Sequence, residues 1–208
     1  MGLRERHKED RRLRILQAAS ALFRAQGYDA VRIEDIAAQA DVSAGTCYNY
    51  FTTKGDILLS IVTLEVEEVI DAGRAVVARP PEDVASALDG LIHIYYDHSL
   101  MYLSKAMWRI AISLTISAPE TPFSQRYSGL DAKLAAQVGD LLVALQHRGR
   151  VRADFDPGLI GRVIFNQLNQ AFIDFCKDEA MSLETLRAES GQMTAQLARL
   201  LSPRVAAE

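Results

Sequence analysis

The residues best suited to chemistry lie close together, within positions 43–54. They supply hydroxyl, phenol, amide and ammonium groups: Ser43, Thr46, Tyr48, Asn49, Tyr50 and Lys54. Outward tyrosine and asparagine are unusual on a plain solvated face, where lysine and glutamate serve better. These groups are, however, well matched to the phosphates and base edges of double-stranded DNA. The pattern therefore indicates DNA recognition rather than catalysis.

Two short helices joined by a tight turn must position these side chains. The sequence from 33 to 51, IEDIAAQADVSAGTCYNYF, predicts a helix-turn-helix whose second helix enters the major groove. Ser43 can cap that second helix, so that its positive N-terminal end faces phosphate. We expect Tyr48 and Lys54 to contact phosphate and Asn49 to contact a base edge. The full expected DNA-binding set is Arg32, Ser43, Ala44, Gly45, Thr46, Tyr48, Asn49, Tyr50 and Lys54.

No catalytic or metal-binding constellation competes with this interpretation. His93 and Asp97, four residues apart, could share a metal or a proton, or form an ordinary polar pair. Cys47 and Cys176 are far apart and have no nearby cysteine partner, so we expect reduced, buried thiols. We predict no enzyme activity, no cofactor and no metal site. Two alternatives stay open: a helix-turn-helix used only for packing, and a small helical enzyme that matches by chance.

The stretch from Gly27 to Lys54 resembles the DNA-binding signature of the TetR family. That signature is commonly written G-[YF], followed by D-I-A-x-x-A-G-V-S-x-G-T-[LF]-Y-x-Y-F-x-x-K. The matching residues are Gly27-Tyr28, Asp35-Ile36-Ala37, Ala40, Val42-Ser43, Gly45-Thr46, Tyr48, Tyr50-Phe51 and Lys54. Further along, Gly149, Asp154, Asp156 and Pro157 resemble the link before the dimerising helices of that family. The close match covers about the first 60 residues, and the remainder agrees in length and helix order.

Three positions depart from the signature. Asp41 replaces the turn glycine, and aspartate is one of the residues that tolerate a left-handed backbone. Arg32 stands where a threonine often precedes the second helix of the domain, which keeps phosphate-binding potential but changes its geometry. Cys47 replaces a larger apolar residue in the recognition helix. These departures affect any base preference carried over from the family.

The rest of the chain has helical periodicity and no strand pattern, which predicts an all-α fold of about nine helices. We expect helices near 10–26, 33–40, 44–51, 54–78, 82–97, 100–117, 123–148, 157–177 and 183–201. We divide the chain into a three-helix DNA-binding domain at 1–54 and a ligand-binding and dimerisation domain at 55–208.

Charge is unevenly distributed, although the net formal charge is −4. Residues 1–54 hold nine basic and seven acidic residues, and the remainder holds 14 and 20, which gives net charges of +2 and −6. Residues 1–14 alone hold six basic and three acidic residues, which suits a local phosphate-binding face. No apolar run is long enough to span a bilayer, and the charged start is unlike a secretory signal. We expect a cytoplasmic protein that has no membrane partner.

The resemblance implies a cavity for a small-molecule effector among the helices from 54 to 177. Apolar walls with a few polar groups suit such a pocket, although the same side chains could simply fill a core. Asn166 and Asn169 would need partners if they were buried in an apolar helix. The ligand-binding candidates are His93, Tyr96, Met101, Tyr102, Met107, Trp108, Phe123, Tyr127, Asn166 and Asn169. The alternative is a C-terminal domain that binds another protein.

The last two helices carry wide apolar faces, and we expect them to pair with their copies in a homodimer. The expected interface residues are Val163, Leu168, Phe172, Phe175 and Leu197. A dimer would present two helix-turn-helix units to the two halves of a palindromic operator. The sequence thus predicts a ligand-responsive repressor that a small-molecule effector releases from its operator.

Overall fold

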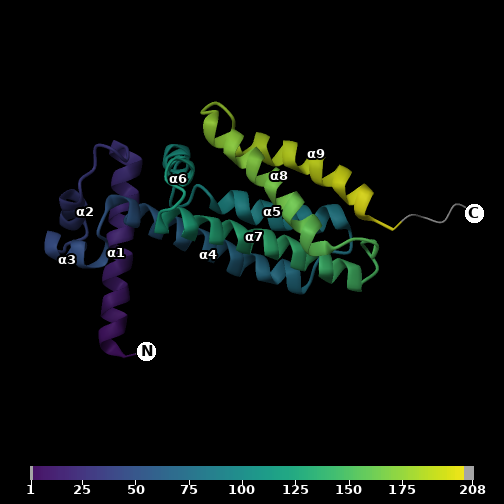
Figure 1. The fold of residues 1–208 in the computed structure, drawn as a ribbon, viewed down its shortest axis with the longest axis horizontal. Coiled ribbons are helices and arrows are strands. Elements are labelled where there is room, and N and C mark those ends of the chain that lie inside the picture. Colours follow the sequence, from purple (N-terminus) through teal and green to yellow (C-terminus); the bar gives the residue numbers. More distant parts are fainter. Residues whose placement is uncertain (1, 204–208) are drawn as a thin grey trace, which may run out of the picture. The chain divides into compact units, whose positions relative to one another are not determined.

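The computed structural model describes residues 2–203, which form nine α-helices and no strand (Figure 1). The helices are α1 (Leu3–Gln26), α2 (Ile33–Gln39), α3 (Ala44–Tyr50), α4 (Lys54–Ala78), α5 (Val84–His98), α6 (Lys105–Ser117), α7 (Pro122–His147), α8 (Pro157–Lys177) and α9 (Leu183–Leu201). The prediction of an all-α fold is therefore confirmed.

Side-chain caps define where many of these helices begin. Five residues accept a hydrogen bond from a backbone N–H of the first turn: Ser43, Asp83, Ser104, Asp156 and Ser182. Each satisfies a donor that has no partner within the helix. Pro157 follows the cap of α8 at a position where its missing N–H costs nothing.

The first packing unit contains the helix-turn-helix. It combines the chain up to Glu65 with Leu100–Tyr127, so α6 belongs to the same unit as α1, α2, α3 and the start of α4. Its buried residues come from all these helices and include Ile15, Phe23, Ile36, Cys47, Ile61 and Trp108. The unit thus has a core of its own.

The second packing unit consists of Val66–Ser99 and the chain from Ser128 onward. Within it, α7 and α8 cross at two glycines, because a Cβ placed on Gly161 would lie 2.5 Å from Gly139 Cα. Tyr96 on α5 donates a hydrogen bond to the Leu168 carbonyl of α8 at 3.0 Å. The glycines allow backbone-to-backbone contact that no larger residue permits.

Two helices begin elsewhere than expected. α1 starts at Leu3 instead of near residue 10. Its charged first turns are helical although their side chains are exposed and bury little surface. α6 starts at Lys105 instead of residue 100. Ser104 caps it, and the segment before it is a loop held by side chains of α1. The apolar pattern of residues 100–117 does not distinguish this loop from the helix that follows it.

The units also divide the chain differently from the expected domains at 1–54 and 55–208. Helix α4 is continuous from Lys54 to Ala78 and runs from the first unit into the second. Met1 and residues 204–208, which belong to the expected domains, lie outside the described part of the chain.

Candidate DNA-binding surface

The turn between α2 and α3 has the geometry that a helix-turn-helix needs. Asp41 adopts a left-handed backbone with φ of 54°, and the Val42 N–H donates to the Ala37 carbonyl at 3.0 Å. The Ser43 hydroxyl oxygen accepts from the Thr46 N–H at 3.1 Å. Cys47, fully buried, faces the core between the helices. Aspartate therefore replaces glycine at this turn without loss of the fold.

Helix α3 presents part of its surface to solvent. Gly45, Tyr48 and Asn49 are exposed, and Tyr48 retains 47% of its surface. Ala44 and Thr46 are less exposed, and the hydroxyls of Thr46 and Ser43 lie 2.8 Å apart. These residues form one continuous surface around the first turns of α3.

Tyr50, the last residue of α3, is anchored rather than free. Its hydroxyl donates to the Lys8 carbonyl of α1 at 3.2 Å, and the residue is half-buried. This bond joins the end of the recognition helix to the N-terminal half of α1. Tyr50 is thus placed to orient α3, in addition to the expected DNA contact.

A glutamate missing from the expected set connects two of its members. The Tyr48 hydroxyl donates to Glu34 Oε1 at 3.1 Å, and Arg32 Nε lies 3.4 Å from Glu34 Oε2. A hydrogen bond from its own backbone and one from Tyr48 hold the pKa of Glu34 below its usual value. The same Tyr48–Glu34 bond raises the pKa of Tyr48. An exposed glutamate in a short helix carries no sequence signal for this role.

Lys54 points into the protein. Its ammonium group donates to the carbonyls of Tyr28, Asp29 and Val31 at 2.7, 3.1 and 3.1 Å, and lies 4.5 Å from the Tyr28 ring centre. These three bonds account for all its hydrogens. The structure therefore places Lys54 as a clamp between α4 and the α1–α2 loop, not in the expected phosphate contact.

The expected ligand-binding residues of the first unit fall into two groups. Met107 and Trp108 are buried on α6, and Phe123 and Tyr127 stack on α7 with ring centres 6.4 Å apart. Met101 and Tyr102 instead line a groove of about 500 Å³ against α1, together with Gln17, Ser20, Ala21, Arg24 and Ala25.

That groove is bridged by hydrogen bonds to the loop before α6. Arg24 Nη1 donates to the carbonyls of Leu100 and Met101 at 3.0 and 2.9 Å, and the Ser20 hydroxyl donates to the Tyr102 carbonyl. The Tyr102 N–H donates to Glu65 Oε2 on α4 at 3.3 Å. The loop is thus fastened to both α1 and α4.

In the second unit, one of the expected ligand-binding residues is a core residue and another is exposed. Tyr96 is buried and stacks on Phe172 at 6.2 Å, and burial raises its pKa to about 12. His93 and Asn169 are half-buried. Asn166 is exposed in the single chain, so its amide has access to water there.

Three of the expected dimer residues lie inside the subunit. Leu168, Phe172 and Phe175 are 3%, 8% and 1% exposed, because they face the core of their own chain. They are therefore corrected to core residues. Val163 is exposed, as an interface residue must be in a single chain, and Leu197 is half-buried. Leu159 on α8 and Leu200 on α9, which are outside the expected set, are also exposed.

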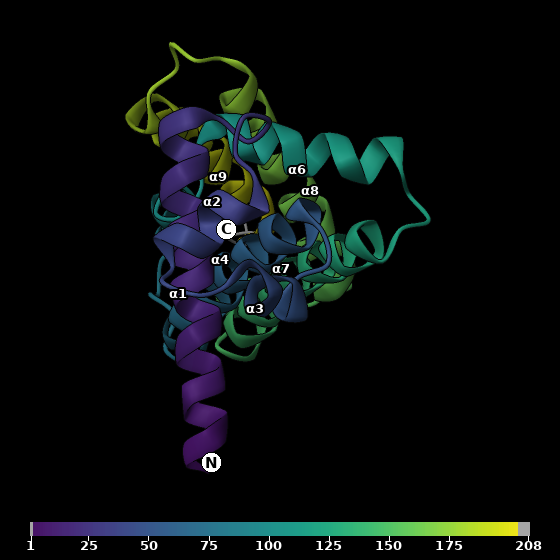
Figure 2. The same cartoon turned by 90° about the vertical axis from the view of Figure 1, so that its left-hand side faces the viewer.

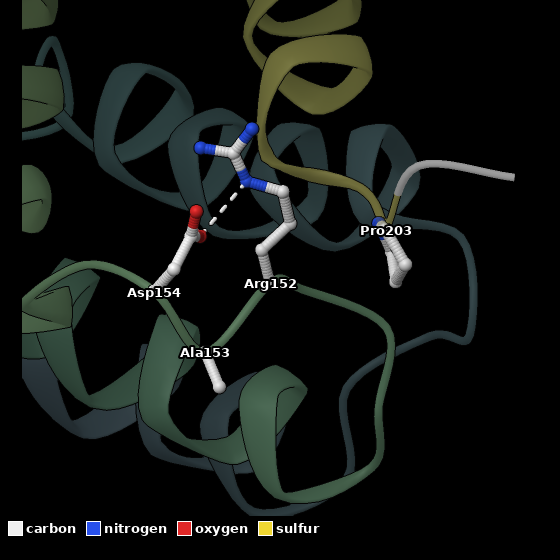
Figure 3. A pocket seen from close by; sticks show the side chains of 4 residues that line it. All are labelled: Arg152, Ala153, Asp154 and Pro203. Carbon is white, nitrogen blue, oxygen red and sulfur yellow. Dashed lines mark ion pairs between the residues drawn. The ribbon is translucent and has the colours of Figure 1, made fainter. Parts of the chain in front are cut away.

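A second pocket, of about 690 Å³, lies in the second unit beside the α7–α8 link (Figure 3). Arg152, Ala153, Asp154 and Pro203 line it. Arg152 Nε lies 3.0 Å from Asp154 Oδ1, although without the geometry of a hydrogen bond. This pair offsets the charges within the pocket.

Residues 2–203 show neither a metal centre nor a membrane span. No cluster of three or more histidine, cysteine, aspartate or glutamate side chains is arranged to hold a metal ion in this range. No helix of this part of the chain is both long and apolar enough to cross a membrane.

Known proteins share both the recognition motif and the fold. A family profile described as "Bacterial regulatory proteins, tetR family" matches residues 15–61. The transcriptional repressor KstR of Rhodococcus jostii is 39% identical over 74 residues, which are 36% of this chain and 35% of KstR. The regulator EthR of Mycolicibacterium smegmatis is 27% identical over 162 residues, covering 78% of this chain and 72% of EthR.

A solved structure extends the likeness over the whole length. Thermus thermophilus FadR, a TetR family transcriptional repressor in complex with lauroyl-CoA, superposes with a TM-score of 0.68. It is 23% identical and covers 95% of this chain and 98% of its own, a likeness that concerns the fold. In KstR, by contrast, the matched segment spans about a third of the relative. The helix-turn-helix segment of the chain thus matches the TetR family of bacterial regulatory proteins, and its helical architecture is that of a solved TetR family repressor.

Proposed function

We propose that this protein is a ligand-responsive transcriptional regulator that binds a palindromic operator as a homodimer. The observation that carries the proposal is the surface of α3, where Gly45, Tyr48 and Asn49 are exposed at the end of a capped helix-turn-helix. An exposed helix of this kind fits the major groove. The match of residues 15–61 to the tetR family model and relatives that are transcriptional regulators support the proposal.

In this proposal the α3 residues have different roles. Asn49 reads a base edge, while Arg32, Tyr48 and the capped start of α3 at Ser43 bind phosphate. Because Glu34 holds both Tyr48 and Arg32 in the free protein, those two side chains exchange the carboxylate for a phosphate when DNA binds. Lys54 acts indirectly, because it fixes the α1–α2 loop to α4 and does not contact DNA itself.

The effector is proposed to be a largely apolar small molecule that binds among the C-terminal helices and releases the operator. The FadR structure of the same fold holds lauroyl-CoA, which supports a ligand site in this class of domain. Effector binding can act on the helix-turn-helix through α4, which begins in the first unit and ends in the second. The loop at 100–102, fastened to Ser20 and Arg24, offers a second connection.

The dimer is proposed to form through the outer faces of α8 and α9. Leu159 and Val163 lie one helical turn apart on α8 and are 51% and 56% exposed, and Leu200 on α9 is 68% exposed. Exposed apolar side chains on neighbouring helices are the expected mark of a surface that a second copy covers.

Selection of bound sequences from random DNA, followed by gel shifts, tests the DNA-binding proposal. We expect a palindromic site, and Asn49→Ala should reduce discrimination at one base position of each half-site by about 1–3 kcal/mol. Gln125→Ala, which removes an exposed amide from α7, is the matched control and should bind as the wild type does. Absence of any selected sequence would refute DNA recognition and favour the helical enzyme or packing alternative.

A further inference from the structure

The groove between α1 and the loop before α6 has a single charged side chain among small, polar and apolar ones. Its volume of about 500 Å³ is typical of a small-molecule site. Both views show this loop beside the C-terminal half of α1 (Figures 1 and 2). We call it the α1 groove, and seven residues line it: Gln17, Ser20, Ala21, Arg24, Ala25, Met101 and Tyr102.

Small side chains on α1 leave the groove open along the helix. Gln17, Ala21 and Ala25 follow one another at every fourth residue, so they share one face of α1, and all three are exposed. At about 1.5 Å per residue, this face extends for about 12 Å. Met101, from the loop, is 54% exposed in the same groove. An elongated strip with alanines on one side and a thioether on the other fits a linear hydrocarbon chain.

Arg24 is held by the loop but keeps one edge of its guanidinium group open. Its Nη1 donates to the carbonyls of Leu100 and Met101 at 3.0 and 2.9 Å. A guanidinium has five N–H donors, and those on Nε and Nη2 have no hydrogen-bond partner among residues 2–203. Nε and Nη2 form the edge that binds both oxygens of a carboxylate. The two loop bonds fix the guanidinium in advance, which lowers the entropic cost of binding.

No acidic side chain in the lining neutralises Arg24. The chain has no aspartate or glutamate from Arg11 to Tyr28, or from His98 to Pro119. Glu65, which contacts the loop from α4, is buried and accepts from the Tyr102 N–H at 3.3 Å. The charge of the α1 groove is therefore complementary to an anion.

We propose that the α1 groove binds a linear carboxylate. The two carboxylate oxygens pair with Nε and Nη2 of Arg24, and the hydrocarbon chain lies along Ala21 and Met101. This is a ligand site within the first packing unit, in addition to the effector site proposed among the C-terminal helices. A ligand bound here joins α1 to a loop that Glu65 already fastens to α4, and so stabilises both connections.

A titration with octanoate, followed at Met101, tests this site. The full-length protein carries ¹³C-methyl methionine, and Met101→Leu identifies the methyl signal of Met101 in the NMR spectrum. We expect octanoate, kept below its critical micelle concentration, to shift this signal saturably. The neutral 1-octanol should shift it far less, because it lacks the charge and the second oxygen that Arg24 binds.

Two substitutions separate the contacts of the head group from those of the chain. Arg24→Lys keeps a cation that can donate to the loop carbonyls but removes the planar fork, and should weaken octanoate binding about tenfold. Ala21→Leu fills the groove without removing the Arg24 bonds, and should abolish the response. Arg14→Lys and Ala132→Leu, at exposed positions outside the groove, are the matched controls and should respond as the wild type does. The remaining methionine signals report whether each variant is folded.

A Met101 signal that did not respond to octanoate would overturn the inference. Equal responses to octanoate and 1-octanol would overturn it too, because the groove would then bind only through apolar contact. An unchanged response in folded Ala21→Leu would place the ligand elsewhere. These outcomes are read without DNA, whereas failure of the proposed function appears as the absence of any selected operator sequence.

Discussion

At the scale of single residues, similar side chains near the turn have different roles because their surroundings differ. Tyr48 and Asn49 project from α3, whereas Lys54, which belongs to the same signature, is bonded to three carbonyls. A lysine that satisfies loop carbonyls stabilises the domain, and a lysine that meets phosphate adds affinity. Measurement separates these two roles.

Replacing Lys54 by methionine should therefore destabilise the protein. Hydrogen bonds to a charged group contribute about 1.5–3 kcal/mol, and the orphaned carbonyls of Tyr28, Asp29 and Val31 add a cost. We expect a loss of about 2–3 kcal/mol in the free energy of unfolding by denaturant. Lys133→Met, at an exposed lysine on α7, serves as the control. Unchanged stability with a smaller salt slope of DNA binding would instead favour the phosphate contact.

Asp131 on α7 makes stability depend on pH. Burial raises the pKa of this carboxyl to about 7, from a usual value near 3.8. The native state thus retains a proton that the unfolded chain releases, so stability that is present below pH 4 is lost progressively as pH rises to 7. Asp131→Asn should stabilise the protein at pH 8 by roughly 2–4 kcal/mol, since one pKa unit corresponds to about 1.4 kcal/mol, and change little at pH 4.

Unfolding by denaturant at both pH values checks this dependence. Asp140→Asn, at an exposed carboxyl on the same helix, should give no comparable difference. A gain from Asp131→Asn that was equal at pH 4 and pH 8 would point to packing rather than to proton release.

At the scale of elements, the crossing of α7 and α8 depends on the absence of side chains. A Cβ on Gly161 would collide with the Gly139 backbone, so the two helices would have to separate. Overpacking of this kind costs about 1–3 kcal/mol. The position of α8, and with it the exposed Leu159 and Val163, follows from these two glycines.

Gly161→Ala should therefore lower the melting temperature, although alanine favours the helix. Gly129→Ala is a matched control on α7, because its Cβ would meet nothing within 4 Å. That control should raise stability by about 0.5–1 kcal/mol through helix propensity alone. Thermal unfolding of both variants gives the comparison, and stabilisation by both would exclude a tight crossing.

At the scale of the whole molecule, the proposed dimer depends on residues that remain exposed in one chain. Val163→Asp should yield a folded monomer that no longer binds the operator. In the proposed dimer, the introduced charge would have to be buried in an apolar interface. Ala136→Asp, which places the same charge at an exposed position of α7, should stay dimeric. Light scattering at micromolar concentration reports the mass, and a monomeric wild type would refute the interface.

The proposed switch between DNA and effector is also a property of the whole dimer. An effector shifts the equilibrium only by its different affinity for the two states, and allosteric coupling is typically about 1–3 kcal/mol, or roughly 5- to 150-fold. Thermal-shift screening identifies a binder, because it stabilises the native state. Calorimetry should then show that saturating operator DNA weakens effector binding by the same factor. Equal affinity with and without operator would contradict this coupling.

The sequence by itself determined the order of the helices, the turn and the recognition motif. These features depend on local spacing: apolar residues at helical intervals, Ser43 as a cap, and Asp41 at a position that needs a left-handed backbone. The exposed positions of Tyr48 and Asn49 followed from the same periodicity. Local rules apply because the interacting groups lie within a few residues of one another.

Only the tertiary structure decided which apolar or charged residues face inward. Leu168 and Val163 look alike in the pattern of α8, yet one fills the core and the other is exposed, because α8 has neighbours on one side only. Lys54 turned inward because the carbonyls of a loop more than 20 residues earlier were within reach. Loop 100–102 lies against α1 through bonds spanning more than 70 residues. Such pairings depend on how helices distant in the sequence pack, which local periodicity does not encode.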